Sequence, residues 1–377
     1  MQHEIFLDKY EALSWIKNPK LTPSRKPKRE IRFIDLFAGC GGLSYGIHQS
    51  SLKNKSKSIC ALAIDSNKAP LKVYEENIPH EKNSIINKNI LDIINIECKS
   101  GLTENERTLQ KKVGKIDILV GGPPCQGHSN LNNSTRRKDP RNNLYLACLR
   151  AVDIFNPNLI IIENVPTVVH STEGVVQTTE ENLKKIGYHV KHLNVNFLDL
   201  GIPQSRKRHV LVASKNKEFC ESLTPTNKRI QIPTLEDFIS DIEPENSMMF
   251  QTGKLSKDNI ERVKFLFENN LYDLPNELRP SCHKDKTHSY KSSYGRLKYD
   301  KPAQTLTSGY GSMGQGRYIH PTERRTINSR EAARIQGFPD SFSFSKVSLI
   351  TELRQMIANS VPPQLTYTIC NHFFNHS

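Results

Sequence analysis

The stretch IRFIDLFAGCGGLSYGIHQS, residues 31–50, combines an apolar run, a glycine-rich turn and the beginning of a helix. Residues 31–37 are apolar enough to form a buried strand. Gly39, Gly41 and Gly42 then allow the backbone to turn sharply into the helix that follows. This order of strand, turn and helix predicts the first unit of an α/β fold.

The same alternation continues along the chain. Strands are expected at 58–65, 115–122, 158–165, 188–197 and 208–214, and helices at 67–77, 141–155 and 179–186. Runs such as IDILV and LIIIE are apolar on both faces, as parallel strands covered by helices on both sides must be. The predicted fold class is therefore α/β, with a doubly wound, mostly parallel sheet.

Composition divides the 377 residues into four parts. Residues 1–30 form a basic leader, because positions 17–32 hold seven basic residues, one acidic residue and three prolines. A solvated arm is favoured there over an arm that contacts DNA. The main domain covers 31–215. A smaller unit at 216–324 is rich in prolines and polar residues, with one convincing helix at 257–270, and a helical pattern returns in 325–377.

The formal net charge of +14 favours a polyanionic partner such as nucleic acid. The sequence has no apolar run near the roughly 20 residues of a membrane helix and no apolar secretion signal at its start, so a cytoplasmic protein without a membrane partner is expected. The eight cysteines form no CxxC pair and no cluster with histidines at zinc-ligand spacing. Neither a metal nor a disulfide is expected.

The glycine turn is a candidate nucleotide site. Its backbone amides can approach a ligand closely at the start of a helix. Asp65, at the end of the next strand, can accept hydrogen bonds from both ribose hydroxyls, and Phe37 offers an aromatic face for adenine. The turn has no GxxxxGK[ST] loop, so a nucleoside without a phosphate cradle is preferred to ATP. The alternative is a turn that serves only the fold.

Three further motifs lie where the strands of such a sheet end. Cys125 in GGPPCQGHS follows a buried strand and two prolines that fix its backbone, which favours a nucleophile over a buried hydrophobic thiol. Glu163 ends the next apolar strand, where it can donate a proton to a ring nitrogen instead of being merely solvated. Arg206 and Arg208 lead into another strand and can hold a base oxygen or a carboxylate, with surface solvation as the alternative.

Seven segments in this order resemble the motif series of the carbon-5 cytosine DNA methyltransferases, especially the bacterial restriction-modification enzymes. They are DLFAGCGG, GGPPCQGHS, DPRNNL, ENV, QSRKR, REAARIQGFPD and ANSVPPQ. The resemblance implies a Rossmann-like fold that binds S-adenosylmethionine, with a target-recognition domain at 216–324. It implies catalytic roles for Cys125, Glu163, Arg206 and Arg208. It implies cofactor contacts at Phe37, Gly39, Gly41, Gly42, Asp65, Asn89, Ile90, Leu144, Asn359 and Ser360.

The resemblance also implies a loop at 126–144 that closes over DNA and a Thr-Leu element at 304–307. Three positions depart from the family pattern. Asp65 stands where Glu is usual, Asn89 precedes Ile90 where Asp is usual, and His128 stands where Phe is common. The shorter Asp65 side chain still reaches a ribose if the backbone shifts slightly.

The implied activity is methyl transfer to carbon 5 of a cytosine flipped out of a specific double-stranded DNA sequence, through a covalent bond to Cys125. A monomer in the bacterial cytoplasm is expected, with a cognate restriction endonuclease that acts separately. One alternative is a transfer RNA cytosine-5 methyltransferase, whose loop motif differs and which lacks so long a recognition segment. Another is an inactive DNA-binding regulator, which the intact Cys125, Glu163 and QSRKR argue against.

Overall fold

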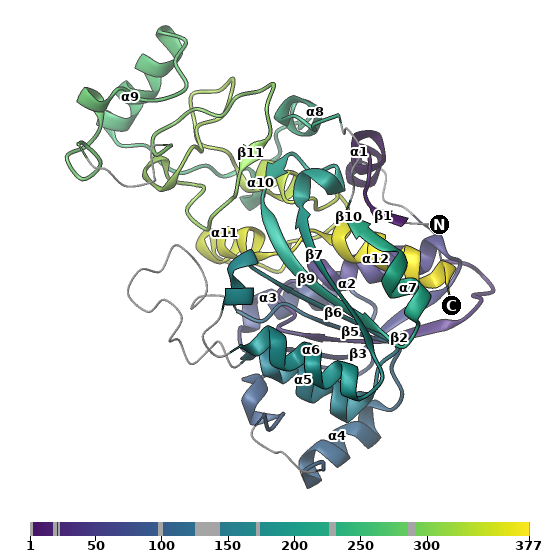
Figure 1. The fold of residues 1–377 in the computed structure, drawn as a ribbon. Coiled ribbons are helices and arrows are strands. Elements are labelled where there is room, and N and C mark those ends of the chain that lie inside the picture. Colours follow the sequence, from purple (N-terminus) through teal and green to yellow (C-terminus); the bar gives the residue numbers. More distant parts are fainter. Residues whose placement is uncertain are drawn as a thin grey trace.

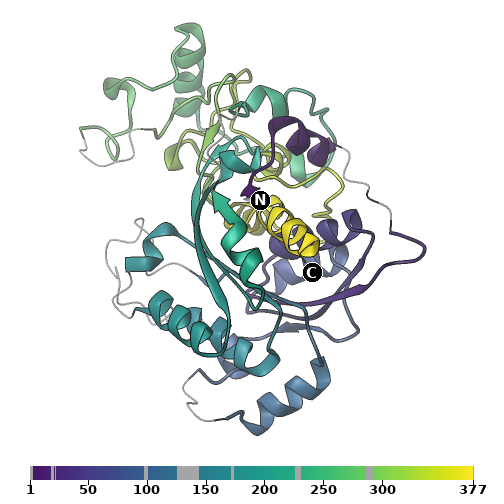
Figure 2. The same cartoon turned by 45° about the vertical axis from the view of Figure 1, so that its right-hand side comes forward.

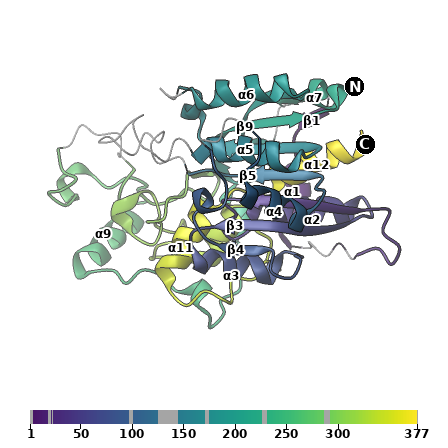
Figure 3. The ribbon, with the colours of Figure 1, turned by 90° about the horizontal axis from the view of Figure 1, so that it is seen from below.

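The computed structural model describes residues 3–17, 21, 23–96, 101–124, 144–170, 174–225, 231–285 and 292–376. Its centre is a seven-stranded sheet in the order β4-β3-β2-β5-β6-β9-β7 (Figure 1). The strands are β2 (Glu30–Leu36), β3 (Lys57–Asp65), β4 (Ile85–Asn87), β5 (Ile118–Gly121), β6 (Leu159–Asn164), β7 (His189–Asn196) and β9 (Lys207–Ser214). Figure 3 shows β4 with α3 towards one edge of the sheet and β9 with α6 towards the other.

Most neighbouring strands are parallel, and β9 is the exception. It runs antiparallel to both β6 and β7, with Glu163 opposite Val210 in the first pair. The predicted doubly wound, mostly parallel α/β sheet is therefore confirmed. Because β9 is reversed, Arg206, directly before it, and Arg208, near its start, lie at the edge at which β6 ends.

Helices cover both faces of the sheet (Figure 2). One face packs against α2 (Gly42–Lys53), α3 (Lys68–Asn77) and α12 (Pro363–Asn375), and the other packs against α4 (Glu104–Val113), α5 (Leu144–Phe155) and α6 (Val175–Lys185). Consecutive residues of β2 belong to different cores, since Phe33 lies in the first cluster and Ile34 in the second. This explains why the central runs of these strands, such as ILVG in β5 and LIII in β6, are apolar without alternation.

The first residues are a packed part of the fold. Strand β1 (His3–Ile5) pairs in parallel with β10 (Leu223–Pro225). Helix α1 (Lys9–Lys17) buries Ala12, Trp15 and Ile16, and the Trp15 ring lies 4.6 Å from that of Tyr367 on α12. A basic leader was expected for residues 1–30, and residues 3–17 of it pack into the fold. The solvated arm was expected for residues 17–32, and of these residues 23–29 are largely exposed.

Part of the segment that follows residue 216 packs with the main domain. Helices α7 (Lys217–Ser222) and α8 (Leu235–Ile239) contribute Phe219 and Phe238 to the core of the main domain. A separate small core forms around α9 (Lys257–Glu268), where Val263, Leu266 and Tyr294 pack together. Figure 1 shows α9 projecting away from the sheet.

The remaining elements are shorter or lie towards the end of the chain. They are β8 (Gln204–Ser205), β11 (Ala303–Gln304), α10 (Ser329–Ile335), α11 (Ile350–Asn359) and short 3₁₀ turns at Ile90–Asp92, Pro166–His170, Phe197–Leu200, Met248–Phe250, Asn276–Leu278 and Met313–Gln315. In the described part of the chain, every helix is too short or too polar to cross a membrane.

Asp35 on β2 is a carboxyl group inside the core. It is 1% exposed, and its Oδ2 accepts a hydrogen bond from Ser44 Oγ on α2. Burial raises the pKa of Asp35 to about 7, whereas an unfolded Asp has a pKa of about 3.9. The folded carboxyl group stays neutral while the unfolded one ionises. The difference between the two pKa values stabilises the folded protein. This contribution of Asp35 to the free energy of unfolding is complete below about pH 4 and is lost as the pH rises towards about 7.

Replacing Asp35 with Asn should remove this pH dependence. Between about pH 4.5 and about pH 8, the free energy of unfolding of the natural chain is expected to fall by roughly 3 kcal/mol more than that of Asp35→Asn. Unfolding in guanidinium chloride at both pH values measures the difference. Equal falls in the two proteins would show that Asp35 is already ionised in the folded state.

Candidate active site

The glycine-rich turn between β2 and α2 is tied to the end of β3 by one carboxylate. Asp65 accepts hydrogen bonds from Gly39 N at 2.9 Å and from Asn67 N at 2.8 Å. Phe37 in the same turn has a φ of 63°. A bulky residue adopts this left-handed conformation only where the surrounding structure imposes it, which is a frequent feature of functional sites.

Two of the glycines are required by packing as well. A Cβ atom on Gly41, whose φ is 93°, would lie 2.9 Å from Tyr74 Cδ2 on α3. A Cβ atom on Gly42 would lie 2.2 Å from the backbone oxygen of Val361, which follows α11. The turn therefore packs closely between α3 and the C-terminal segment. This close packing is a reason for glycine that the sequence did not reveal.

A cavity of about 1220 Å³ opens where β2, β3, β5 and β6 end. Its lining brings together most of the residues predicted to form the site: Phe37, Gly39, Gly42, Asp65, Glu163, Arg206, Arg208, Asn359 and Ser360. These positions come from segments far apart in the sequence. The motif series thus converges on one continuous space at the carboxyl edge of the sheet, where open α/β folds bind their ligands.

Cys125 and the predicted closing loop up to residue 143 lie outside the described residues. The backbone that leads to them, at Pro123 and Pro124, lines the cavity. Asn164 Nδ2 donates a hydrogen bond to Pro123 O at 3.1 Å, which holds this backbone against the end of β6. This role of Asn164 was not predicted, although its position directly after Glu163 at the end of β6 was a signal.

Glu163 and Arg208 form an ion pair in the wall of the cavity. Arg208 Nε lies 2.6 Å from Glu163 Oε1, and the two side chains are 14% and 8% exposed. The guanidinium is also anchored, because its Nη1 donates to Lys207 O at 2.8 Å. Neither side chain is the freely solvated group of the alternative interpretation. The ion pair is the contact that the predicted orienting role of Arg208 requires, and that role stays a prediction.

Arg206 points elsewhere. It is 5% exposed, its Nη1 donates to Ala358 O at 2.8 Å, and its guanidinium lies 5.4 Å from the centre of the Phe197 ring. These contacts exclude a solvated surface arginine. They connect the segment before β9 to the end of α11, so the structure gives Arg206 a supporting role, and a direct catalytic role stays a prediction.

The predicted Thr-Leu element lies beside the QSRKR segment. Strand β11 pairs in parallel with β8, with Gln304 opposite Ser205. Thr307 is fixed by Tyr318, whose hydroxyl oxygen lies 3.0 Å from Thr307 N and 2.9 Å from Thr307 Oγ1. Residues 304–308 all line the cavity. The smaller unit thus supplies one wall of the site.

Four predicted cofactor positions do not line the cavity. Asn89 is exposed and caps a 3₁₀ turn, with its Oδ1 accepting a hydrogen bond from Leu91 N at 3.1 Å. Ile90 is buried in the core, Leu144 packs against the same core at the start of α5, and Gly41 faces Tyr74. Contacts from these four residues to a cofactor stay predictions.

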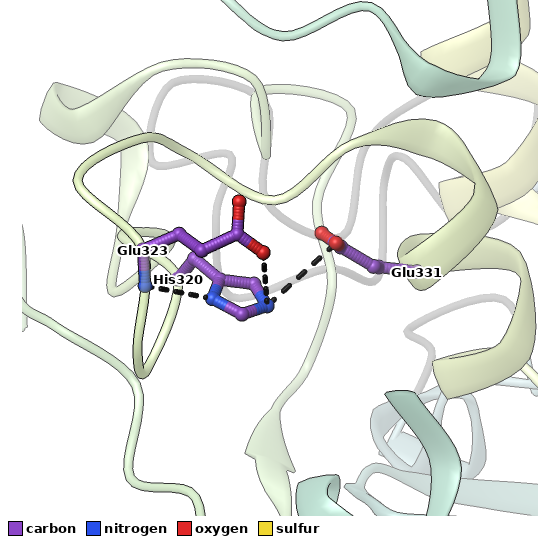
Figure 4. A group of neighbouring side chains, drawn as sticks. All are labelled: His320, Glu323 and Glu331. Carbon is purple, nitrogen blue, oxygen red and sulfur yellow. Dashed lines mark hydrogen bonds and ion pairs between the residues drawn. The ribbon is translucent and has the colours of Figure 1, made fainter. Parts of the chain in front are cut away.

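His320, Glu323 and Glu331 form a compact group away from this cavity (Figure 4). Arg325 donates to Glu331 at 2.6 and 2.9 Å and to Glu323 at 2.7 and 2.8 Å. His320 Nδ1 accepts from the backbone amides of Thr322 and Glu323, so the proton of the neutral ring lies on Nε2, which faces the carboxylates. The carboxylates already have a cation, and the group is an internal ion cluster.

Comparison with known proteins agrees with the geometry. The sequence profile described as C-5 cytosine-specific DNA methylase matches residues 31–375. The Type II methyltransferase M1.BsuMI of Bacillus subtilis is 39% identical over 364 residues, which cover 95% of this chain and 84% of the relative. The Type II methylase M.HgiDII of Herpetosiphon aurantiacus is 32% identical over 345 residues, which cover 88% of this chain and 92% of the relative.

Solved structures share the fold. The Dnmt2 methyltransferase of S. pombe superposes with a TM-score of 0.61 at 19% identity, and the match covers 92% of this chain and 99% of that one. The seven motifs, the cavity at which they meet and the match over residues 31–375 lead to one assignment. The chain belongs to the C-5 cytosine-specific DNA methylase family.

Proposed function

We propose that this protein transfers a methyl group from S-adenosylmethionine to carbon 5 of a cytosine in a specific double-stranded DNA sequence. One observation carries the proposal. A single cavity joins the glycine turn and Asp65 on one side to the Glu163–Arg208 ion pair on the other. A methyl donor and an extruded base both have a place in this space.

The residues present fit the methyl donor. Phe37 supplies an aromatic side chain for adenine, and Asp65 supplies carboxylate oxygens for the ribose. Each Asp65 oxygen accepts one backbone hydrogen bond and keeps a free lone pair for a hydroxyl group. Asn359 and Ser360 also line the cavity and offer polar groups for the amino-acid end of the molecule.

Removal of the Asp65 carboxylate should weaken cofactor binding. Asp65→Ala is expected to lose about 1 to 3 kcal/mol of S-adenosylmethionine binding free energy, because buried hydroxyl groups are left without an acceptor. Titration calorimetry measures this loss. Asn67→Ala, which removes the cap of α3 but keeps Asp65, is the control. Unchanged affinity in Asp65→Ala would show that Asp65 only ties the turn together.

The chemistry requires a nucleophile in the protein. Carbon 5 of cytosine does not accept a methyl group unaided, and attack of the Cys125 thiolate on carbon 6 forms a bond that raises the electron density at carbon 5. Bound S-adenosylmethionine supplies the electrophilic methyl group. Loss of the carbon 5 proton and cleavage of the bond between sulfur and carbon 6 then release Cys125.

Glu163 and Arg208 would act on the opposite side of the ring. The Glu163 carboxyl group stabilises the charge at ring nitrogen 3 by sharing a proton with it. Arg208, held 2.6 Å from Glu163, keeps that group in place and can bind the base oxygen. Because a duplex hides both ring carbons, the cytosine must be flipped out, at a cost of a few kcal/mol. The net charge of +14 favours the DNA backbone contacts that offset this cost.

A covalent trap tests the proposal. DNA that contains 5-fluorocytosine at the target position carries fluorine in place of the carbon 5 hydrogen, so the bond between sulfur and carbon 6 cannot be released after methyl transfer. We expect a stable complex in the presence of S-adenosylmethionine, and a peptide map should place the adduct on Cys125. An adduct on another of the eight cysteines would contradict the assignment.

Sequence choice is assigned to residues 216–324. Within them, residues 279–324 hold nine basic and three acidic residues with tyrosines at 290, 294, 299, 310 and 318. The basic residues suit phosphate contacts with DNA. Tyr294, Tyr310 and Tyr318 are buried, so they contribute to packing and not to the readout of base edges that the sequence pattern suggested. The alternative is an insertion that only braces the sheet, and the small separate core around α9 argues for an independent unit.

A chimera tests this assignment. Replacement of the segment with its counterpart from a relative of different specificity should change which sites are methylated, while the Cys125 chemistry remains. The replaced segment should begin after α8, since α7 and α8 belong to the main core. Bisulfite sequencing maps the sites. An active chimera that keeps the original sites would place recognition elsewhere in the chain.

The relatives suggest the biological setting. M1.BsuMI and M.HgiDII are named as Type II methylating enzymes of bacteria, so we infer a role in a restriction-modification system, beside a separate endonuclease, in the bacterial cytoplasm. We also infer that the protein acts as a monomer. Action on transfer RNA is not favoured, because these relatives carry the Type II designation and the matching profile is that of a DNA methylase.

A further inference from the structure

A directed series of hydrogen bonds, here called the amide relay, runs from the Thr-Leu element to the end of α11. Leu306 N donates to Gln204 Oε1 at 3.1 Å, and Gln204 Nε2 donates to Gln336 Oε1 at 2.6 Å. Gln336 Nε2 in turn donates to Ser360 O. Each amide accepts on one side and donates on the other, so the relay fixes the orientation of both side chains.

The relay lies inside the protein. Gln204 and Gln336 are both 0% exposed. Burial of an amide is costly unless its polar atoms have partners, and an apolar side chain of similar size would fill the same space without that cost. The two glutamines therefore specify how four segments are placed: the Thr-Leu element, β8, the end of α10 and the end of α11.

Both ends of the relay reach the cavity. Leu306 lines it from the smaller unit, and Ser360 lines it beside the glycine turn, with Ser360 Oγ 3.0 Å from Cys40 Sγ. A second hydrogen bond connects the segment after β8 with the end of α11, because Arg206 Nη1 donates to Ala358 O at 2.8 Å. The end of α11, which carries the predicted cofactor contacts, is thus held from the side on which the recognition unit docks.

We propose that Gln204 and Gln336 are positioning residues that couple DNA binding to cofactor binding. When a bound duplex fixes the Thr-Leu element against β8, the relay also fixes the end of α11. Each ligand therefore reduces the conformational entropy that is lost when the other ligand binds. By reciprocity, S-adenosylmethionine should strengthen DNA binding by the same factor. This inference rests on the proposed function, since it takes both ligands from it.

Replacement of Gln336 by Met tests the relay. The substitution keeps the side-chain volume, removes the donor to Ser360 O, and leaves Gln204 Nε2 its second acceptor, Ile335 O at 3.2 Å. The control is Gln364→Met. Gln364 is also 0% exposed and donates to Gly337 O at 2.8 Å, next to the relay but not part of it. Loss of packing or stability should be similar in both variants.

The readout is the Kd of S-adenosylhomocysteine, measured by calorimetry with and without a duplex that carries a site found by bisulfite sequencing. In the natural chain and in Gln364→Met, the duplex is expected to tighten binding by about fivefold or more. In Gln336→Met this factor should fall below about twofold, with little change in the Kd measured without DNA. Gln204→Met breaks the relay at its other amide and should behave like Gln336→Met. It is the test variant if Gln336→Met does not fold.

Three results would overturn the relay while leaving the proposed function intact, and two of them come from the variants. One is an undiminished factor in Gln336→Met or Gln204→Met. The other is an equal loss in Gln364→Met, which would indicate general loosening. A natural chain that binds each ligand without effect on the other also contradicts the relay alone, whereas a natural chain that binds no S-adenosylhomocysteine at all contradicts the proposed function.

Discussion

Replacing Cys125 with Ser is expected to abolish methyl transfer, with a fall in turnover on the order of 10⁴-fold or more. A thiol with an ordinary pKa of about 8.5 is partly ionised near neutral pH, whereas a serine hydroxyl is scarcely ionised. DNA binding should be largely retained, because the substitution removes neither charge nor volume from the DNA contacts. Transfer of a labelled methyl group to DNA and a gel-shift assay measure the two properties.

A second cysteine supplies the control for this experiment. Cys220 is buried on α7, where its thiol donates a hydrogen bond to His189 O at 3.2 Å, and a serine can make the same bond. Cys220→Ser should therefore retain its activity. Turnover near that of the natural chain in Cys125→Ser would remove Cys125 from the mechanism.

Glu163→Gln is expected to lower turnover by about 10² to 10⁴-fold, the range that a general acid or base contributes. The neutral amide keeps the shape of the side chain but cannot share a proton with ring nitrogen 3. It also leaves the Arg208 guanidinium without the charged partner that lies 2.6 Å away. Single-turnover kinetics at saturating DNA and S-adenosylmethionine measure the effect on the chemical step.

Another ion pair between Glu and Arg gives a matched control. Glu81 pairs with Arg32 at the start of β2, away from the edge of the sheet that holds the cavity. Glu81→Gln removes a carboxylate of the same kind and should leave turnover nearly unchanged. If Glu163→Gln turned over as fast as Glu81→Gln, the ion pair in the cavity would have only a structural role.

The central sheet could be predicted because its strands carry a strong local signal. In β3 and β6 nearly every residue is apolar, and the glycines and helices around them mark the boundaries. The direction of β9 carries no such signal. An apolar run has the same sequence pattern in a parallel and an antiparallel strand, and the direction of β9 depends on how the chain returns after β7.

The first helix was missed although a signal existed. Ala12, Trp15 and Ile16 have the spacing of one helical face, and all three are buried in α1. The charged residues around them and the basic segment that follows favoured a solvated leader. The packing of α7 and α8 had no clear signal for a similar reason, since these short helices bury Phe219 and Phe238 within otherwise polar sequence.

The motifs indicated the residues of the site and a contact between an arginine and a carboxylate, but not the contacts that hold the segments of the site together. Glu163 and Asp65 each lie at the end of a predicted strand. Because parallel strands end at the same edge of a sheet, both residues could be placed at that edge. The contact of Gln204 with Gln336 joins residues 132 positions apart, and no local pattern indicates such a pairing. The packing of Gly42 against Val361 is equally non-local.

Bisulfite sequencing of DNA from cells that express the protein tests the central claim most directly. The proposal predicts 5-methylcytosine at one defined sequence throughout the genome, present with the natural chain and missing with Cys125→Ser. A genome without 5-methylcytosine, in cells that contain the folded natural chain, would contradict methyl transfer to carbon 5 of cytosine in DNA.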